Sequence, residues 1–347
     1  MKAAVLEKYN HDLIFKEVSK PIIREHDDVI IRVAATGVCR TDIHIKNGDR
    51  MDRTTLPLIM GHESVGFIED IENEGSIFSK GQPVILYPWV TCGYCNNCRK
   101  GNDVFCTGNR YQPGIEKDGG YAEFLKTKVR SLVPIPEGLT NKEFIRMAPL
   151  SDAAVTAYHA IRKLSHLYRH NSRLVVLGAG GGLGHIAVQM LKTMTPSKII
   201  ALDSSEKGLK LALDLGADYG ILSGADGGVK DLMKITGGEG ADVVFDFVGE
   251  GSVTTNSIGM IRKQGTLSII GNGGSFTEST HDMIIREINI LGNLTGTYVE
   301  LREVVDLYLE GTFKVVGPEY RLSDVNKALG DLKNGKFLGR AIMIPGK

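Results

Sequence analysis

The fold is decided by the stretch Arg173-Leu174-Val175-Val176-Leu177-Gly178-Ala179-Gly180-Gly181-Gly182-Leu183-Gly184. Residues 173–177 form a short apolar run with the length of a buried strand, and residues 183–194 have apolar side chains at helical spacing. A strand, a glycine-rich turn and a helix in this order begin a βαβ unit. The stretch therefore predicts a parallel sheet with covering helices.

The same alternation continues toward the carboxyl terminus. Residues 198–203 read as a second strand, and the helix that follows places Leu209, Ala212, Leu213 and Gly216 on one face. Further apolar strands are expected at residues 241–246, 265–270 and 288–291. Strands that alternate with helices are typical of a doubly wound α/β sheet.

The first 150 residues have a different pattern. Short apolar runs such as 28–33 and 82–86 are separated by Gly, Pro and Asp turns, which indicates a mostly β domain. After residue 293, a helix carries Leu301, Val304, Val305 and Tyr308 on one face, and the strand-like residues 339–344 are expected to return to the first domain. A chain of 347 residues exceeds the usual single-core limit of about 250 to 300 residues. We therefore expect one domain of residues 1–150 and 293–347 and a second of residues 151–292.

The glycine turn favours a dinucleotide ligand. Glycines let the backbone approach a pyrophosphate, and the helix amino terminus stabilises its charge. The spacing is not the strict G-x-G-x-x-G, and a glycine-rich turn without a ligand is the alternative. Asp203 decides for the nucleotide, because it ends the next strand, where a carboxylate accepts hydrogen bonds from the adenosine ribose and repels a 2′-phosphate. We expect NAD rather than NADP, with contacts from Gly178, Gly180, Gly181, Gly182, Leu183, Gly184 and Asp203.

Four cysteines lie close together in the first half of the chain. Cys92, Cys95, Cys98 and Cys106 follow the pattern C-x2-C-x2-C-x7-C, which allows four thiolates to hold one tetrahedral zinc ion in a lobe of about residues 90–107. Two disulfides, an iron-sulfur cluster and a nucleic-acid-binding zinc ribbon are the alternatives. The spacing differs from both ferredoxin patterns, and a balanced charge argues against nucleic acid.

Charge and apolar content limit the partners. The chain has 41 basic and 41 acidic residues without a block of one sign, which argues against nucleic acid and an anionic membrane surface. The first residues lack the apolar stretch of a signal peptide, and no run approaches the roughly 20 apolar residues of a membrane span. We expect a cytoplasmic protein, in which thiols stay reduced and a small molecule is the ligand.

Three further segments carry side chains suited to chemistry. They are Gly37–His44 with Cys39, Gly61-His62-Glu63, and Ala148–Asp152. Taken singly, Cys39 can be a small core residue, His62 a loop histidine and Asp152 a helix cap. Together they supply a thiolate, an imidazole and a carboxylate.

These segments, the cysteine lobe, the nucleotide turn and Gly119-Gly120-Tyr121-Ala122-Glu123 resemble the zinc-containing medium-chain alcohol dehydrogenases from Met1 to the carboxyl terminus. The pattern is closest to that of prokaryotic secondary-alcohol enzymes. The resemblance implies a GroES-like catalytic domain and a Rossmann domain. It also implies two zinc ions, NAD, and a homodimer or homotetramer.

The resemblance assigns roles residue by residue. Cys39, His62 and Asp152 are the expected ligands of a catalytic zinc, with Glu63 as an adjacent or alternating ligand and Asp42 as the carboxylate that orients His62. Many relatives carry Cys where this chain has Asp152. Thr41 and His44 are the expected proton relay, and Trp89 is expected in the substrate pocket, where a core tryptophan is the alternative. The remaining cofactor contacts are expected from Arg40, Thr156, Phe247, Ile270 and Arg340.

The implied reaction is reversible hydride transfer between a primary or secondary alcohol and NAD. A polyol or sugar dehydrogenase of the same superfamily is the alternative with the same chemistry. A zinc-stabilised binding protein is a more distant alternative, because Cys39, Thr41, His44, His62 and Asp152 are all present together. A zinc-free quinone reductase is also more distant, because it needs neither Cys39 nor the cysteine lobe.

Overall fold

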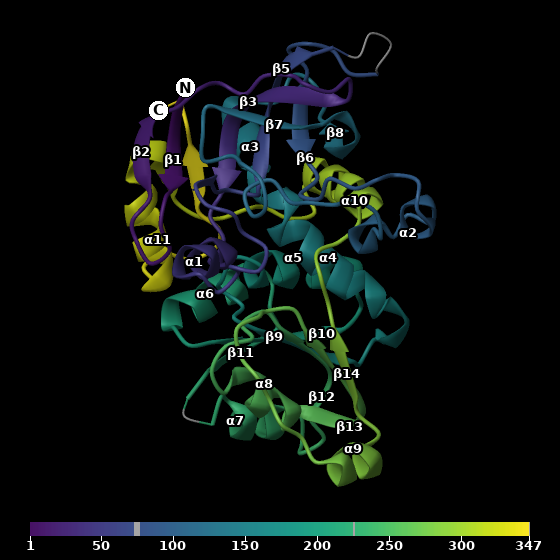
Figure 1. Cartoon of the computed structure of the whole chain (residues 1–347). Coiled ribbons are helices and arrows are strands. Elements are labelled where there is room, and N and C mark those ends of the chain that lie inside the picture. Colours follow the sequence, from purple (N-terminus) through teal and green to yellow (C-terminus); the bar gives the residue numbers. More distant parts are fainter. Residues whose placement is uncertain (73–76, 225, 347) are drawn as a thin grey trace. The chain divides into compact units, whose positions relative to one another are not determined.

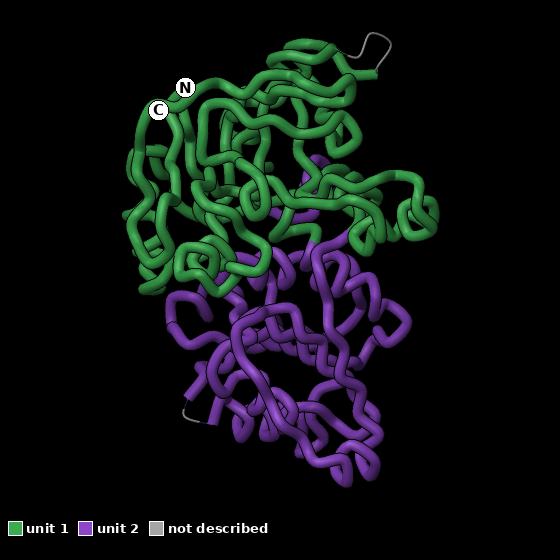
Figure 2. Tube along the Cα trace, viewed as in Figure 1, with its two compact units in different colours: residues 1–155, 297–306, 315–347 green, residues 156–296, 307–314 purple. Residues whose placement is uncertain are grey.

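The chain divides into two compact units. The computed structural model describes residues 1–72, 77–224 and 226–346. Figure 2 shows unit 1, which contains Met1–Val155, Thr297–Asp306 and Val315–Lys347, and unit 2, which contains Thr156–Gly296 and Leu307–Lys314. We expected the divisions at residues 150 and 293, with no return to the second domain. The short segment ending at Lys314 belongs to unit 2 because the Gln189 side chain bonds both the backbone N–H and the carbonyl of Lys314.

Unit 2 contains the sheet that the glycine stretch predicts. Its described strands are all parallel and run in the order β11-β10-β9-β12-β13-β14. Figure 1 labels each of these strands. The order reverses between β9 and β12, and the crevice at the carboxyl ends of such strands is the usual ligand position in this fold. The strands are β9 (Arg173–Leu177), β10 (Lys198–Asp203), β11 (Tyr219–Leu222), β12 (Ala241–Asp246), β13 (Ile261–Ile269) and β14 (Asn289–Gly292).

Helices connect these strands. Helix α6 ends at Asp214, before the predicted Gly216, because Gly216 has φ +112° and closes the helix in the left-handed region. The core beneath the helices includes Val175, Leu202 and Val244, all of which are buried. The helices are α5 (Gly184–Met194), α6 (Glu206–Asp214), α7 (Val229–Ile235), α8 (Val253–Ile258) and α9 (Thr280–Arg286), with α4 (Ala153–Lys163) largely in this unit.

Strand β11 was not predicted. Its residues Tyr-Gly-Ile-Leu contain a single buried side chain, Ile221, because the strand lies at an edge of the sheet. A strand with one buried residue shows neither an apolar run nor a clear alternation.

Unit 1 is mostly β, as predicted. A three-stranded sheet has the order β2-β1-β4, and a seven-stranded sheet has the order β15-β16-β3-β5-β6-β8 with β7 also paired to β3. The strands are β1 (Lys2–Leu6), β2 (Ile14–Glu17), β3 (Asp28–Gly37), β4 (Leu58–Ile59), β5 (Ser64–Ile71), β6 (Pro83–Leu86), β7 (Phe124–Lys128), β8 (Leu132–Pro134), β15 (Glu319–Arg321) and β16 (Ile342–Ile344).

The last strand, β16, joins the carboxyl-terminal segment to unit 1, as expected for the tail. It pairs antiparallel with β3 through Ile342–Gly37 and Met343–Thr36. Buried side chains from both ends of the chain, including Leu6 and Met343, share one core cluster. The helices of this unit are α1 (Arg40–Asn47), α2 (Asn96–Arg99), α3 (Asn141–Ile145) and α11 (Val325–Lys333), while α10 (Tyr298–Leu309) begins here and ends in unit 2.

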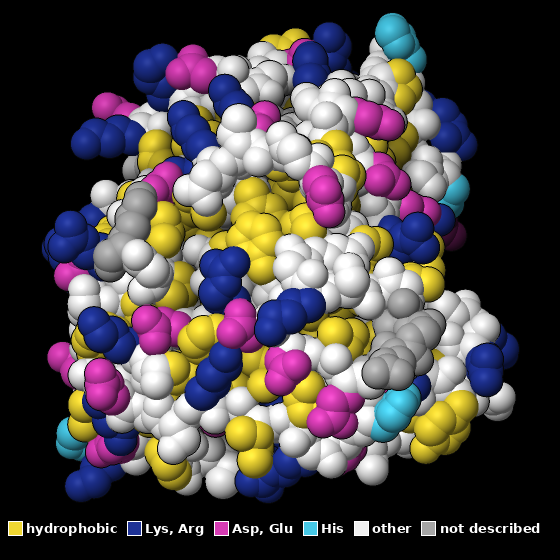
Figure 3. Space-filling model, turned by 90° about the horizontal axis from the view of Figure 1, so that it is seen from above, with side chains coloured by type: hydrophobic (Ala, Val, Ile, Leu, Met, Phe, Trp, Pro, Cys, Tyr) yellow, Lys and Arg dark blue, Asp and Glu magenta, His cyan; other side chains and the backbone are white. Residues whose placement is uncertain are grey.

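The surface mixes charges of both signs. On the face in Figure 3, Lys and Arg side chains are interspersed with Asp and Glu. Among the described residues, no helix has both the length and the apolar character needed to cross a membrane.

Candidate active site

Four potential metal ligands meet at one end of the seven-stranded sheet. Cys39 follows β3, and His62 and Glu63 precede β5, which pairs with β3 through Thr36–Ser64. This pairing places both segments at the same end of the two strands. Asp152 joins them from the turn before α4, and one ligand atom of each residue lies within 4.8 Å of the others.

The separations within this cluster suit a shared ion. Asp152 Oδ2 lies 3.6 Å from Cys39 Sγ and 3.6 Å from His62 Nε2. Glu63 Oε1 lies 4.0 Å from His62 Nε2. Ligand atoms about 2.0 to 2.3 Å from a tetrahedral zinc lie about 3.3 to 3.8 Å from each other.

Glycines make this convergence possible. A Cβ at residue 37 would overlap the Glu63 carboxylate, and Gly61 has φ +92° immediately before His62. Only glycine meets both requirements without strain.

A buried arginine balances the carboxylates. Arg340, which is 4% exposed, donates from Nε to Glu63 Oε2 at 3.1 Å and from Nη2 to both Glu63 Oε1 and, at 3.2 Å, Asp152 Oδ2. We had expected the Arg340 guanidinium at a cofactor pyrophosphate. In this structure it lies on two of the metal-site carboxylates, and its role toward the pyrophosphate stays a prediction.

Burial and neighbouring charges shift the protonation of the cluster. Burial lowers the pKa of His62, but the carboxylates of Asp42 and Asp152 outweigh it and raise that pKa well above the usual value. Burial also raises the pKa of Glu63, to about 7, although Arg340 opposes the shift. Without a metal, the cluster therefore holds protons near neutral pH that a cation displaces.

Asp42 lies behind His62. Its Oδ1 is 3.4 Å from His62 Nδ1, and its Oδ2 accepts hydrogen bonds from the Cys39 backbone N–H at 2.8 Å and from the Tyr121 hydroxyl at 2.7 Å. Burial and the Asp42 charge raise the pKa of Tyr121, so its hydroxyl stays protonated. A carboxylate behind a ligating imidazole fixes the ring and its tautomer.

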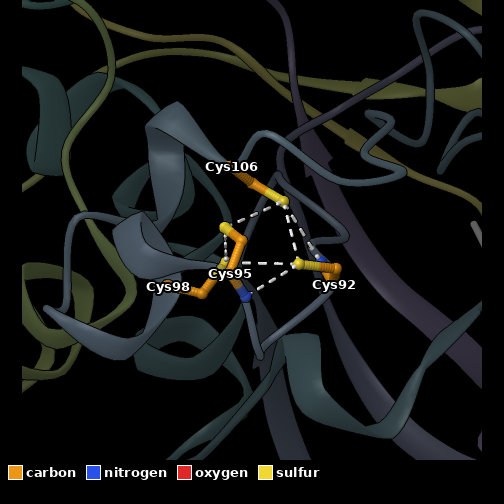
Figure 4. A group of neighbouring side chains, drawn as sticks. All are labelled: Cys92, Cys95, Cys98 and Cys106. Atoms are coloured by element: carbon orange, nitrogen blue, oxygen red, sulfur yellow. Dashed lines mark hydrogen bonds between the residues drawn. The ribbon is translucent and has the colours of Figure 1, made fainter.

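The four lobe cysteines form a second cluster. Figure 4 shows Cys92, Cys95, Cys98 and Cys106 pointing toward one another, with Sγ–Sγ separations of 3.4 to 4.0 Å. These separations exceed the S–S bond length of about 2.05 Å, and all four cysteines are free. Thiolates on a tetrahedral zinc lie about 3.8 Å apart. Backbone N–H groups of Cys98 and Thr107 lower the pKa of Cys95 to about 5, which favours the thiolate.

The glycine turn in unit 2 lies at the reversal of strand order. Gly178 follows β9 with φ +71°, and a Cβ there would contact Val248, which follows β12. A Cβ at Gly180 would overlap the backbone of Gly208, and one at Gly184 would overlap Gly178. The turn therefore needs these three glycines, and it leads directly into α5.

Three other predicted cofactor residues lie at the same ends of these strands. Asp203 ends β10, and its Oδ2 accepts a hydrogen bond from the Gly180 N–H at 2.8 Å. Phe247 follows β12 and stacks on Phe245, and the Ile270 N–H bonds the Asp246 carbonyl. Thr156 is buried in α4.

Helix α1 carries the residues expected to move protons. Thr41 and His44 lie on it one turn apart, beginning two residues after Cys39, and His44 Nδ1 is 3.0 Å from Asp49 Oδ2. Arg40 is the first residue of the same helix and is exposed.

Two family descriptions match this chain. Residues 25–137 match the alcohol dehydrogenase GroES-like domain, and residues 182–310 match zinc-binding dehydrogenase. An NAD-dependent alcohol dehydrogenase of Sulfolobus acidocaldarius is 35% identical, with 99% of each chain covered. The chain belongs to the zinc-containing medium-chain alcohol dehydrogenase family.

Solved structures of similar proteins agree with this assignment. The alcohol dehydrogenase of the archaeon Aeropyrum pernix is 41% identical, with a TM-score of 0.96 over 99% of this chain and 100% of that one. Another relative is the D-arabinose 1-dehydrogenase (NADP(+)) of Saccharolobus solfataricus, which is 31% identical over 99% of this chain and 97% of its own length. Both parts of the predicted fold, GroES-like and Rossmann, are confirmed.

Both clusters of this dehydrogenase fit zinc. The lobe offers four sulfurs, as structural zinc sites do, and the other cluster offers sulfur, nitrogen and oxygen, as catalytic sites do. A third cluster consists of the carboxylates of Glu25, Asp27 and Asp28. It differs from the two zinc-type clusters because all three carboxylates bind the Lys128 ammonium.

Trp89 is 2% exposed, and the guanidinium groups of Arg53 and Arg110 lie over its ring, 5.5 and 4.9 Å from the ring centre. Arg53 also binds Gln112 and Glu116, and Gly114 of that turn approaches the His62 backbone. Neither Arg53 nor Tyr121 is predicted from the sequence as a functional residue. Tyr121 lies in the Gly119–Glu123 segment, which carried the family resemblance, so a signal was present for it; no comparable signal pointed to Arg53.

Proposed function

We propose that the chain is a zinc- and NAD-dependent alcohol dehydrogenase that interconverts a primary or secondary alcohol with its aldehyde or ketone. The observation that carries this is the meeting of Cys39, His62, Glu63 and Asp152 within 4.8 Å, in a chain that also holds a glycine turn closed by Asp203. Zinc-assisted alcohol oxidation combines a Lewis acid, which polarises the alcohol oxygen, with a dinucleotide, which accepts the hydride.

Cys39, His62 and Asp152 would hold the catalytic zinc, with Glu63 as an adjacent ligand. Such an ion acts as a Lewis acid that lowers the pKa of an alcohol, as it lowers that of water from about 15.7 to about 7. Thr41 would accept the hydroxyl proton while releasing its own, through the cofactor ribose, to His44, which would pass it to solvent. Arg340 neutralises Glu63 and Asp152, which keeps the cluster from accumulating negative charge.

Unit 2 would bind the nucleotide. The N–H groups at the start of α5 suit a pyrophosphate, and Asp203 suits the ribose hydroxyls. The two arginines predicted to contact the pyrophosphate, Arg40 and Arg340, belong to unit 1. Thr156, Phe247 and Ile270 would contact the nicotinamide half. Trp89 would line the substrate pocket.

Zinc content and a substrate panel test the proposal. The purified protein is expected to hold two zinc ions per chain and to reduce NAD with 2-alkanols or aryl-alkyl carbinols, followed by NADH absorbance. The C39S variant should keep the lobe zinc, lose the other and lose activity, whereas C98S should lose the lobe zinc. A single zinc in the wild type, or full activity in C39S, would refute the proposed centre.

A sugar or polyol substrate is the second candidate. The 31% identity to the D-arabinose 1-dehydrogenase (NADP(+)) of Saccharolobus solfataricus favours including sorbitol, glucose and arabinose in the same panel, with both cofactors. A higher kcat/KM for these substrates than for simple alcohols would identify the protein as a sugar or polyol dehydrogenase.

We further propose that the protein is a cytoplasmic homodimer or homotetramer. Five free cysteines suit a reducing compartment. The edge strand β14 and the exposed Ile284 and Ile285 of α9 offer an apolar edge for self-association. Light scattering on a sizing column measures the assembly, and a monomer at micromolar concentration would exclude it.

A further inference from the structure

The segment Gly119–Glu123 lies against the backbone that carries His62. The N–H groups of Gly119, Gly120 and Tyr121 bond the carbonyls of Ile59, Gly61 and Met60, at 2.7 to 2.9 Å. A Cβ at Gly119 would overlap the Gly61 carbonyl, and one at Gly120 would overlap the Ser64 hydroxyl. The two glycines therefore allow the following residue, Tyr121, to approach the metal cluster.

Tyr121 is held in place on several sides. It has no solvent exposure, its carbonyl accepts the Ala4 N–H at 2.8 Å, and its ring lies where a Cβ of Gly61 would be. The position of its hydroxyl is therefore fixed by the fold rather than by rotation of the side chain.

The Tyr121 hydroxyl is linked to His62 through one carboxylate. It donates to Asp42 Oδ2 at 2.7 Å, where the Cys39 N–H also donates at 2.8 Å. Two donors on Oδ2 leave Oδ1 to face His62 Nδ1, which is 3.4 Å away. Asp42 has no solvent exposure, so water does not replace either donor.

This arrangement fixes which imidazole nitrogen can bind a cation. A proton on Nδ1 toward Asp42 leaves the lone pair of Nε2 for the metal, and Nε2 is the atom that lies 3.6 Å from Asp152. Without the phenol, the Asp42 carboxylate loses one of the two bonds that set its rotation, and the imidazole loses a fixed partner.

We propose that Tyr121 is a positioning residue of the metal site, whose hydroxyl orients Asp42 so that His62 presents Nε2 to the ion. The proposal rests on the ligand set of the proposed function. It assigns a role to the Gly119–Glu123 segment that the nucleotide and metal sites leave unexplained.

The test compares zinc retention in Y121F and Y168F, each of which loses one buried hydroxyl and keeps the ring. Tyr168 donates to the Ile161 carbonyl within unit 2, whereas the residues of both clusters belong to unit 1. With zinc-loaded protein and a chromophoric chelator, Y121F should release one of two zinc ions at a chelator concentration about 10- to 100-fold lower than the wild type. Y168F should match the wild type, and Y121F that also matches it overturns the proposal.

A double-mutant comparison asks whether Tyr121 acts through Asp42. The variant Y121F/D42N should hold the ion no more weakly than D42N alone, and independent additive losses would contradict the mechanism. If Y121F does not fold, D42N alone decides, because wild-type zinc retention in D42N overturns the proposal. A wild type with only the lobe zinc would instead defeat the proposed function, so the two failures are distinguishable.

Discussion

The guanidinium of Arg340 lies on the Glu63 carboxylate through two nitrogen–oxygen contacts, and both side chains are almost fully buried. Glu63 is adjacent to His62, a proposed zinc ligand, while Arg340 lies in the carboxyl-terminal segment. The pair therefore ties the carboxyl-terminal segment to the metal cluster and neutralises a charge that burial would otherwise make costly.

Removing Arg340 should destabilise the protein strongly. R340A leaves a buried carboxylate without its cation, which typically costs about 3 to 5 kcal/mol in the free energy of unfolding. K210A removes an exposed pair with Asp214 and should cost less than about 0.5 kcal/mol. Urea unfolding of both variants measures the difference, and equal small losses would show that the Arg340–Glu63 pair adds no stability.

Asp203 should set the choice of cofactor. D203S removes the charge that repels a 2′-phosphate, so kcat/KM with NAD should fall and the ratio of NADP to NAD efficiency should rise about tenfold or more. D242N is the control, because Asp242 lies near the start of β12, where it accepts a hydrogen bond from the Arg173 backbone N–H, whereas Asp203 lies at the end of β10. D242N should leave the cofactor ratio unchanged. An unchanged cofactor ratio in D203S would contradict the assignment.

The contribution of His44 to kcat should be largest at low pH. If His44 relays the proton, H44Q lowers kcat mainly at low pH, because a water or hydroxide route replaces the relay as pH rises. His170 is exposed in unit 2, so H170Q should leave the pH profile unchanged. A loss in H44Q that is the same at every pH counts against the relay.

Asp28 should stabilise the fold in a defined pH range. Burial opposes its charge, but the N–H groups of Arg24 and Glu25 and the ammonium groups of Lys126 and Lys128 lower its pKa from 3.8 to about 2. A lowered folded-state pKa stabilises the protein above pH 3.8, and this contribution is lost as pH falls toward 2.

The corresponding variant is D28N. At neutral pH it should lose about 2 kcal/mol, from about 1.36 kcal/mol per pKa unit, and the gap to the wild type should narrow between pH 4 and pH 2. The control is D214N, because Asp214 is exposed and pairs with Lys210. Its free energy of unfolding should stay close to that of the wild type over this pH range. A D28N deficit that is independent of pH would indicate lost packing rather than lost charge.

The sequence was sufficient for the fold where patterns are local. The strands at 173–177, 198–203 and 241–246 are confirmed to the residue, because buried parallel strands are continuous apolar runs. The edge strand β11 was missed because only Ile221 is buried there. The predicted strand at 339–344 is shorter, beginning at Ile342, because the Arg340 backbone N–H bonds the Val316 carbonyl and its guanidinium bonds Glu63 instead.

Of the candidate site too, only the features encoded in local motifs could be predicted from the sequence. Cys39, His62 and Asp152 each stand in a recognisable motif, so the sequence could nominate them together. The contact of Arg340 with Glu63, and that of Tyr121 with Asp42, join residues from distant segments. Such pairs depend on the register of strands and on glycine contacts, which no single stretch of sequence encodes.

The position of β16 bears on how the protein matures during translation. Met343 must pair with Thr36 to complete the seven-stranded sheet, and Arg340 beside it contacts Glu63. A ribosome synthesises both segments of unit 2, Thr156–Gly296 and Leu307–Lys314, between these partners, so unit 2 can reach its native state while unit 1 still lacks its final strand. The counter-charge of the cluster at Cys39 and His62 is therefore complete only when Arg340 has been synthesised, whereas all four lobe cysteines are present by residue 106.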